Sequence, residues 1–250
     1  MLETIRSEGA KPPFFVVHGL QGAMPIGRAL DRALDRDRPL YALHATGIAG
    51  TEPPHERMED ALNGYLAEIR AVRPRGPYVL GGICAGSFVA MGLARALAEA
   101  GERVGAAILV DPPPVPFYQL PGHRDIDLKA DRRVYQQLAG NVEQTFRLVA
   151  RQFELPFDVS DPVQLQRAIE VGVTMAMNFG RYVPPPFDGP TEFIISDERA
   201  FSHFHPQGPW KSIVTRPGRF HVIPGRHSEF FYSNLDEILR LVQFALDSAF

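Results

Sequence analysis

A cysteine flanked by glycines is the residue whose type and position most clearly suggest chemistry. Gly82-Ile83-Cys84-Ala85-Gly86 follows an apolar run typical of a strand and precedes an Ala- and Leu-rich run typical of a helix. A sharp strand-to-helix turn needs neighbours almost without side chains, and it places the central residue at the helix N-terminus, where a negative charge is favoured. Because the thiolate is the reactive form of cysteine, Cys84 is predicted to be a nucleophile rather than an inert buried thiol.

Such a nucleophile needs a histidine base, and the base needs an acid to orient it. Where the nucleophile sits on a turn of this kind, the chain order is nucleophile, acid, histidine. His227 follows the last predicted strand and precedes the last predicted helix, so it is the expected base. The other histidines fit less well: His18, His44 and His55 precede Cys84, His123 lies in a predicted insertion, and His203, His205 and His221 are not in a loop after a strand. The His203–His205 pair is a weak metal signal, and no metal is expected.

Two aspartates are candidates for the acid. Asp111 ends the strand after the Cys84 helix, and Asp197 ends the strand that follows the insertion. Both strands are predicted to end at the same edge of the sheet, so either carboxylate could reach His227. The alternative for each is a helix cap or a turn residue.

The carbonyl attacked by Cys84 would need N–H donors for its developing negative charge. The backbone N–H of Ala85, directly after the nucleophile, is one expected donor. The other is expected in the tight loop after the first strand, at Leu20 or Gln21, directly after His18-Gly19.

Strands alternate with helices on either side of Cys84, which predicts an α/β fold with a mostly parallel sheet covered by helices on both faces. Short apolar and β-branched runs predict strands, and apolar residues spaced three or four apart predict helices. The expected strands are 13–18, 39–43, 78–82, 104–110, 191–196 and 219–223, and the expected helices are 25–34, 58–72, 87–100 and 235–246. Between about residues 112 and 186 the pattern changes to two helical stretches, 128–153 and 162–179, bordered by prolines, which we interpret as an insertion.

Composition restricts the class of protein further. The 250 residues are 45% hydrophobic and 22% charged, and they are expected to form one domain, residues 1–250, with the insertion at about 112–186. A net charge of −3 gives no reason to expect nucleic acid or an anionic membrane as a partner. A single cysteine excludes an intrachain disulfide, and without a membrane-length apolar run we expect a monomeric, soluble cytoplasmic protein.

The residues around these positions resemble the thioesterases of the α/β-hydrolase fold that end nonribosomal peptide and polyketide synthesis. The resemblance runs through residues 12–19, 65–70 and 75–82 and through Pro224-Gly225-Arg226-His227. It implies that Asp111 rather than Asp197 is the acid, because the number of residues between Cys84 and Asp111 is usual for the nucleophile and acid of that family. It also implies that 112–186 is a helical lid, and that the partner is an acyl or peptidyl carrier protein whose phosphopantetheine arm presents the substrate, with no bound cofactor.

The chain departs from most of this family in carrying cysteine where they carry serine. A cysteine acyl-enzyme is itself a thioester, so loading is nearly thermoneutral and the acyl group stays activated. The resemblance therefore implies that an acyl, aminoacyl, peptidyl or polyketide chain is released by hydrolysis, by cyclisation, or by transfer to an amine or a second carrier thiol.

Two other functions remain open from the sequence. One is a small lactone or ester hydrolase of the dienelactone hydrolase type, which also uses a cysteine turn, and the other is a non-catalytic binding module on a hydrolase fold. The sequence does not determine the acyl group, because the aromatic and methionine side chains of the insertion could line an apolar tunnel or belong to the core. These side chains are Phe117, Tyr118, Met175, Met177, Phe179 and Tyr182, and Trp210, which lies after the insertion, is equally ambiguous.

Overall fold

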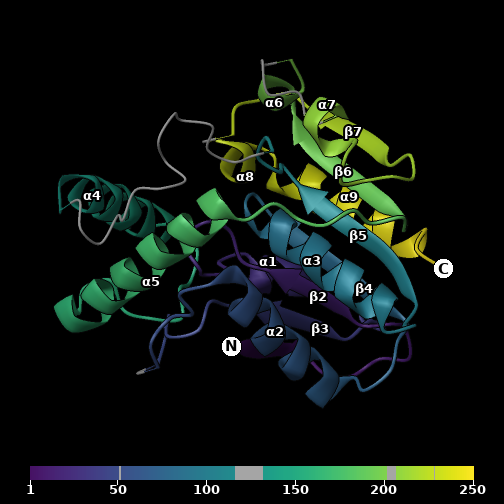
Figure 1. The fold of residues 1–250 in the computed structure, drawn as a ribbon, viewed down its shortest axis with the longest axis horizontal. Coiled ribbons are helices and arrows are strands. Elements are labelled where there is room, and N and C mark those ends of the chain that lie inside the picture. The colour runs from purple at the N-terminus through teal and green to yellow at the C-terminus, as the bar shows by residue number, and fades with distance from the viewer. Residues whose placement is uncertain (51, 116–131, 202–206, 228) are drawn as a thin grey trace.

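The strands form one sheet in the order β1-β3-β2-β4-β5-β6-β7 (Figure 1). The computed structural model describes residues 1–50, 52–115, 132–201, 207–227 and 229–250. Only β1 runs antiparallel to its neighbour, and the other pairs are parallel. The strands are β1 Leu2–Arg6, β2 Phe14–Val17, β3 Leu40–Leu43, β4 Tyr78–Ile83, β5 Val104–Val110, β6 Thr191–Ser196 and β7 Arg219–Ile223. The predicted mostly parallel sheet is confirmed.

Helices cover both faces of this sheet, as predicted. Their bounds are α1 Gly27–Ala33, α2 Met58–Val72, α3 Gly86–Glu99, α4 Arg132–Val149, α5 Pro162–Arg181, α6 Asp197–Phe201, α7 Gln207–Trp210, α8 Phe230–Ser233 and α9 Leu235–Asp247. Figure 1 shows α2 and α3 on one side of the sheet and α9 on the other. Because side chains alternate along a strand, Phe15 and Val17 of β2 pack with α2 and α3, whereas Phe14 and Val16 pack with α1 and α9. Burial on both faces explains why β2 is apolar throughout.

Strand β1 was not predicted from the sequence. It is an edge strand with polar residues and partial exposure, and its Glu3 carboxylate lies 2.8 Å from Nε2 of His44. An edge strand that exposes one side carries no continuous apolar run, so periodicity alone does not identify it. The single-turn helices α6, α7 and α8 were missed for a similar reason, because they are too short to show a helical period.

Helices α4 and α5 lie between β5 and β6 in the chain and pack against each other at one end of the molecule (Figure 1). Helix α5 begins where it was predicted, because Asp161 caps the N–H groups of Val163 and Gln164 and Pro162 occupies the first turn. It runs two residues past the predicted end. Helix α4 ends at Val149 rather than 153, and residues 128–131 of the predicted helix lie outside the described residues.

The described ranges contain no helix with both the length and the apolar composition needed to cross a membrane.

His18 follows β2 directly, and its ring contacts helices α2 and α5. Its ring is fully buried, with Nδ1 2.6 Å from the Gly19 carbonyl oxygen and Nε2 2.7 Å from the Tyr65 hydroxyl. Because a carbonyl only accepts, Nδ1 carries the proton and Nε2 accepts from Tyr65 of α2. Phe179 of α5 lies edge-on to the same ring. These contacts hold the start of the loop after β2, and burial lowers the pKa of His18 to about 3.

Acid should therefore destabilise the protein through His18. Between pH 6.5 and about 3 the unfolded chain protonates this histidine and the folded chain does not, so stability falls as the pH falls through that range. We expect a drop from about pH 8 to about pH 5 to lower the free energy of unfolding by about 2 kcal/mol more in the wild type than in His18→Gln. Urea denaturation at the two pH values measures the difference, and equal losses in both proteins would contradict the assignment.

Candidate active site

The turn that carries Cys84 depends on two close backbone approaches. A side chain at Gly82 would overlap the Gly86 carbonyl, and one at Gly86 would overlap the His18 carbonyl, so both positions require glycine. Cys84 has a φ of 50°, in the left-handed region, and its N–H donates to the Val110 carbonyl at 2.8 Å. The turn thus has the sharp geometry expected from the sequence, and it places the thiol two residues before the start of α3.

The structure brings the three predicted residues Cys84, His227 and Asp111 together. The Sγ atom of Cys84 lies 3.4 Å from Nε2 of His227, and Nδ1 of His227 lies 2.5 Å from Oδ2 of Asp111. The three residues follow β4, β7 and β5, whose carboxyl ends meet at one edge of the sheet. Side chains from distant parts of the sequence are therefore aligned as nucleophile, imidazole and carboxylate.

The Asp111 carboxylate is fully buried, where it accepts three hydrogen bonds and forms an ion pair with Arg199. Oδ1 accepts from the backbone N–H and the hydroxyl of Ser196, at 2.8 and 2.9 Å. Oδ2 faces His227 Nδ1 and also Nε of Arg199, at 3.3 Å. Asp111 also has a φ of 48°, a conformation that aspartate tolerates better than most residues. Burial alone would raise the pKa of this carboxyl, but His227 and Arg199 outweigh burial and lower it.

The other candidate acid, Asp197, has a different role in the structure. Its carboxylate accepts from the Gly225 N–H at 3.0 Å, and the neighbouring Glu198 accepts from the His227 backbone N–H at 2.8 Å. Both residues hold the loop that carries His227, whereas Asp111 contacts its ring. Of the two candidate aspartates, Asp111 is therefore the one in contact with the His227 imidazole, and its role as the acid stays a prediction. Ser196, Glu198 and Arg199 were not identified from the sequence, which has no motif that marks them.

Charge favours an ion pair between the thiol and the imidazole. Burial opposes ionisation of Cys84, but the charge and hydrogen bond of His227 outweigh it, so the pKa of the thiol is lowered. Burial also disfavours the imidazolium, yet the Cys84 charge and the Asp111 hydrogen bond raise the pKa of His227 to about 9. Both shifts act in the direction that favours a thiolate beside an imidazolium.

The predicted oxyanion donors come from the residue directly after Cys84 and from the loop after β2. Ala85 is buried at the start of α3, and Leu20 and Gln21 line the cavity beside the thiol. Within the described residues, neither the Ala85 nor the Leu20 N–H donates to another group of the chain.

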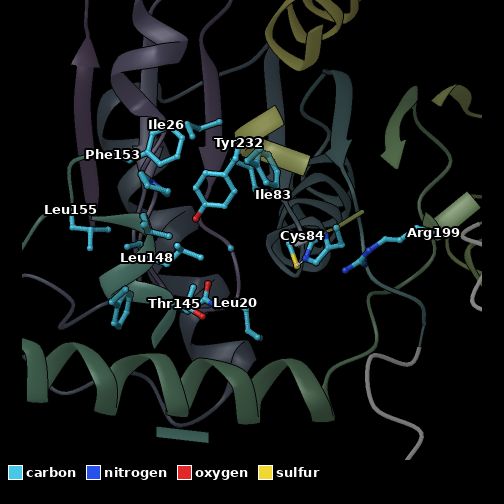
Figure 2. A pocket seen from close by; sticks show the side chains of 18 residues that line it. Leu20, Ile26, Ile83, Cys84, Thr145, Leu148, Phe153, Leu155, Arg199 and Tyr232 are labelled. Atoms are coloured by element: carbon cyan, nitrogen blue, oxygen red, sulfur yellow. Dashed lines mark hydrogen bonds between the residues drawn. The ribbon is translucent and has the colours of Figure 1, made fainter. Parts of the chain in front are cut away.

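A largely apolar cavity of about 430 Å³ opens next to Cys84. Figure 2 shows Ile26, Phe153 and Leu155 toward one end of it and Cys84 and Arg199 toward the other. Its wall includes four residues of α4 and two aromatic residues at α8, namely Thr145, Phe146, Leu148, Val149, Phe231 and Tyr232. The site therefore combines a charged group of reacting residues with an apolar space of acyl-chain size.

The described aromatic and methionine side chains that the sequence assigned either to a tunnel or to the core pack in or against the core. Met175, Phe179 and Trp210 are buried and pack in it, Met177 and Tyr182 pack against it, and none of the five lines this cavity. Phe117 and Tyr118 lie outside the described residues, as do His123, His203 and His205. Among the side chains that the structure describes, no group of three or more histidine, cysteine, aspartate or glutamate residues is arranged so that it could hold a metal ion.

Comparison with known proteins assigns the family. Residues 12–245 match the thioesterase domain family, so the chain belongs to it. Part of the chain is also 35% identical over 113 residues to malpinin synthetase of Mortierella alpina, a match that covers 45% of this chain and 2% of that protein. Matches of this kind cover no more than 12% of the length of the first curated relatives.

Solved structures support the fold. The NocB thioesterase domain from the nocardicin cluster aligns with a TM-score of 0.72 at 19% identity, over 98% of both chains. The type II thioesterase BorB from the borrelidin cluster aligns with a TM-score of 0.68 at 20% identity, over 98% of this chain and 97% of that one. At this level of identity the likeness establishes the thioesterase α/β-hydrolase fold and leaves the substrate open.

The ion pair can be tested by alkylation, because Cys84 is the only cysteine. We expect iodoacetamide to label Cys84 of the wild type readily at neutral pH. His227→Gln should react at least about tenfold more slowly, because the thiolate of Cys84 loses the imidazolium that stabilises it. Mass spectrometry of the intact protein over time gives the rates. His221→Gln is the matched control, because His221 pairs with Glu192 instead. Equal rates in the wild type and His227→Gln would contradict the assignment.

Proposed function

We propose that this chain takes an acyl or peptidyl chain from the phosphopantetheine thioester of a carrier protein onto Cys84 and then releases it. The observation that carries the proposal is the 3.4 Å contact between Cys84 Sγ and His227 Nε2 at the turn beside the cavity. The family supports thioester chemistry, and several relatives are nonribosomal peptide synthetases, including the dimodular synthase of Bacillus subtilis, 34% identical over 117 residues. The thioesterase family also favours this activity over a dienelactone hydrolase.

Acylation begins from the ion pair. The Cys84 thiolate attacks the thioester carbonyl, forming a C–S bond and a tetrahedral oxyanion. When the intermediate collapses, the bond to the pantetheine sulfur breaks, and that sulfur leaves as a thiol after taking the proton from His227. Asp111 keeps the imidazole oriented with Nδ1–H toward itself, so that Nε2 faces the sulfur atoms.

The oxyanion would accept hydrogen bonds from the N–H groups of Ala85 and Leu20. These donors are held by α3 and by the loop after His18, so they need no rearrangement as charge develops. The N-terminal end of α3 adds its partial positive charge at the same place.

Deacylation reverses the proton transfer. Neutral His227 takes a proton from the attacking water, hydroxyl, amine or thiol, and the acyl bond to Cys84 breaks as the sulfur leaves. Because the Cys84 acyl-enzyme is a thioester, the thiolate is a good leaving group, which suits hydrolysis, cyclisation and transfer to a second carrier alike.

The segment from about 112 to 186 is proposed to act as a lid within a single thioesterase domain of residues 1–250. Its helix α4 supplies one wall of the cavity, at Thr145, Phe146, Leu148 and Val149. A catalytic thiol must also stay reduced, which fits the cytoplasmic site of action expected from the sequence.

Acyl transfer to Cys84 can be observed directly. Mixing the chain with an acyl-loaded carrier protein should add the acyl mass to the wild type and nothing to Cys84→Ala. Cys84→Ser should load more slowly, because a hydroxyl ionises far less readily, and its adduct should last longer, because an oxoester is less reactive. Intact-protein mass spectrometry follows each species. A wild type that carries no adduct with any of several acyl groups would overturn the proposal. A second, unloaded carrier separates transfer from release of the free acid.

The two aspartates should differ sharply in their effect on turnover. We expect Asp111→Asn to lower kcat/KM for a short acyl thioester about a hundredfold or more, because the imidazole loses its orienting charge. Asp197→Asn should stay within about threefold, because it affects only the Gly225 contact. Release of free thiol gives both values. The opposite ranking would make Asp197 the acid, and near-equal small effects would remove the carboxylate from the mechanism.

A further inference from the structure

His18 and Tyr65 form a buried hydrogen-bonded pair that has no part in the triad. His18 is fully buried directly after β2, and Tyr65 of α2 is also buried. The Tyr65 hydroxyl donates to Nε2 of His18 at 2.7 Å, and Nδ1 of His18 donates to the Gly19 carbonyl oxygen at 2.6 Å. Burial lowers the pKa of His18 and raises that of Tyr65, so near neutral pH the imidazole is neutral and the hydroxyl keeps its proton. The two bonds therefore link α2 to the loop after β2.

The carbonyl held by His18 belongs to the same peptide group as the Leu20 N–H. A peptide group is planar, and in its trans form the C=O and N–H bonds point in opposite directions. The Gly19–Leu20 peptide is trans, so a carbonyl directed at the His18 ring directs the Leu20 N–H away from that ring. The orientation of this N–H, the proposed oxyanion donor, thus depends on the contact between His18 and Gly19.

This peptide also lies beside the turn that carries the thiol. A side chain at Gly19 would come within 3.7 Å of the Ile83 carbonyl oxygen, the residue directly before Cys84. Gly19 and Leu20 line the cavity together with Cys84. A rotation of the Gly19–Leu20 peptide would therefore change where its N–H points at the place where an acyl group on Cys84 would lie.

Tyr65 favours the ring form of His18 that this arrangement needs. A neutral imidazole has one donor and one acceptor nitrogen, and a hydroxyl that donates to Nε2 favours the proton on Nδ1, facing Gly19. Without that hydroxyl, the proton gains nothing by staying on Nδ1 except the Gly19 contact, and Nε2 loses its buried donor. The form protonated on Nε2, or a rotated ring, would release the Gly19 carbonyl.

We propose that Tyr65 is a positioning residue for acyl transfer, which acts through His18 to fix the Gly19–Leu20 peptide with its N–H toward the oxyanion formed at Cys84. The inference rests on the proposed function and gives α2 a share in stabilising its transition state. A donor held in place before the charge develops needs no reorganisation, and loss of one such donor typically costs roughly a hundredfold to a thousandfold in rate. A donor that is loosened rather than lost should cost less.

Two reactions of the same thiol separate positioning from a general structural effect. Acylation by the N-acetylcysteamine thioester of hexanoic acid passes through a tetrahedral oxyanion, whereas alkylation by iodoacetamide displaces iodide at a saturated carbon and forms none. We expect Tyr65→Phe to acylate Cys84 at least about tenfold more slowly than the wild type. Its alkylation rate should stay within about twofold, because Cys84 and His227 keep their contact. Rapid quenching and intact-protein mass spectrometry measure both rates.

Two further variants test the route through His18. Tyr78→Phe is the matched control, because it removes a tyrosine hydroxyl that donates to the Arg73 carbonyl at 2.8 Å, at the opposite end of β4 from Cys84. It should leave both rates unchanged. His18→Gln, which has no ring nitrogen to hold the Gly19 carbonyl, should slow acylation selectively, and adding Tyr65→Phe to it should have little further effect.

The outcomes distinguish this inference from the function beneath it. Acylation by Tyr65→Phe at the wild-type rate, or slowed no more than its alkylation, would overturn the inference and leave the proposed function standing. Independent effects of Tyr65→Phe and His18→Gln would refute the route through His18. If urea denaturation shows that Tyr65→Phe does not fold, His18→Gln alone decides by the same comparison of rates. A wild type that iodoacetamide alkylates but the thioester never acylates would remove the proposed function and this inference with it.

Discussion

The buried carboxylate of Asp111 is the interaction on which the candidate site depends. A carboxylate taken out of water is costly unless its oxygens find donors or an opposite charge, and here Ser196 supplies two hydrogen bonds, His227 a third, and Arg199 an ion pair. These partners come from β6, from α6 and from the loop after β7, so three separate segments converge on one charge. Once the carboxylate is held in this way, the imidazole of His227 has one orientation, with Nε2 directed to the thiol.

A second constraint acts at the backbone. Gly82 and Gly86 let β4 and α3 approach each other and the His18 carbonyl, and His18 is in turn fixed by Tyr65. The same contacts that hold the sheet edge together thus place the thiol, the start of α3 and the loop of Leu20. Packing and reactivity are coupled here, because the turn that exposes Cys84 exists only while the neighbouring strand end is in position.

The choice of cysteine changes what such a site does with an acyl group. With serine, the acyl-enzyme is less reactive than the incoming thioester, whereas with Cys84 the two are of similar energy. In the proposed function the largely apolar cavity beside Cys84 would receive the acyl chain.

Much of this protein could be predicted from local patterns along the chain. The strands, the longer helices and the turn at Cys84 depend on short-range properties, namely apolar runs, helical spacing and glycines that allow a close approach, and His227 followed from chain order. Periodicity did not detect β1, whose residues are half-exposed, or the single-turn helices. Both aspartates follow neighbouring strands, so the sequence does not distinguish them. The tertiary structure alone decided that Asp111 contacts the His227 ring, whereas Asp197 accepts from Gly225 in the loop that carries His227. It also decided that Ser196 and Arg199 complete the carboxylate site and that α4 forms the cavity wall. Those contacts join residues far apart in sequence, and their distances depend on how the segments pack rather than on any local pattern.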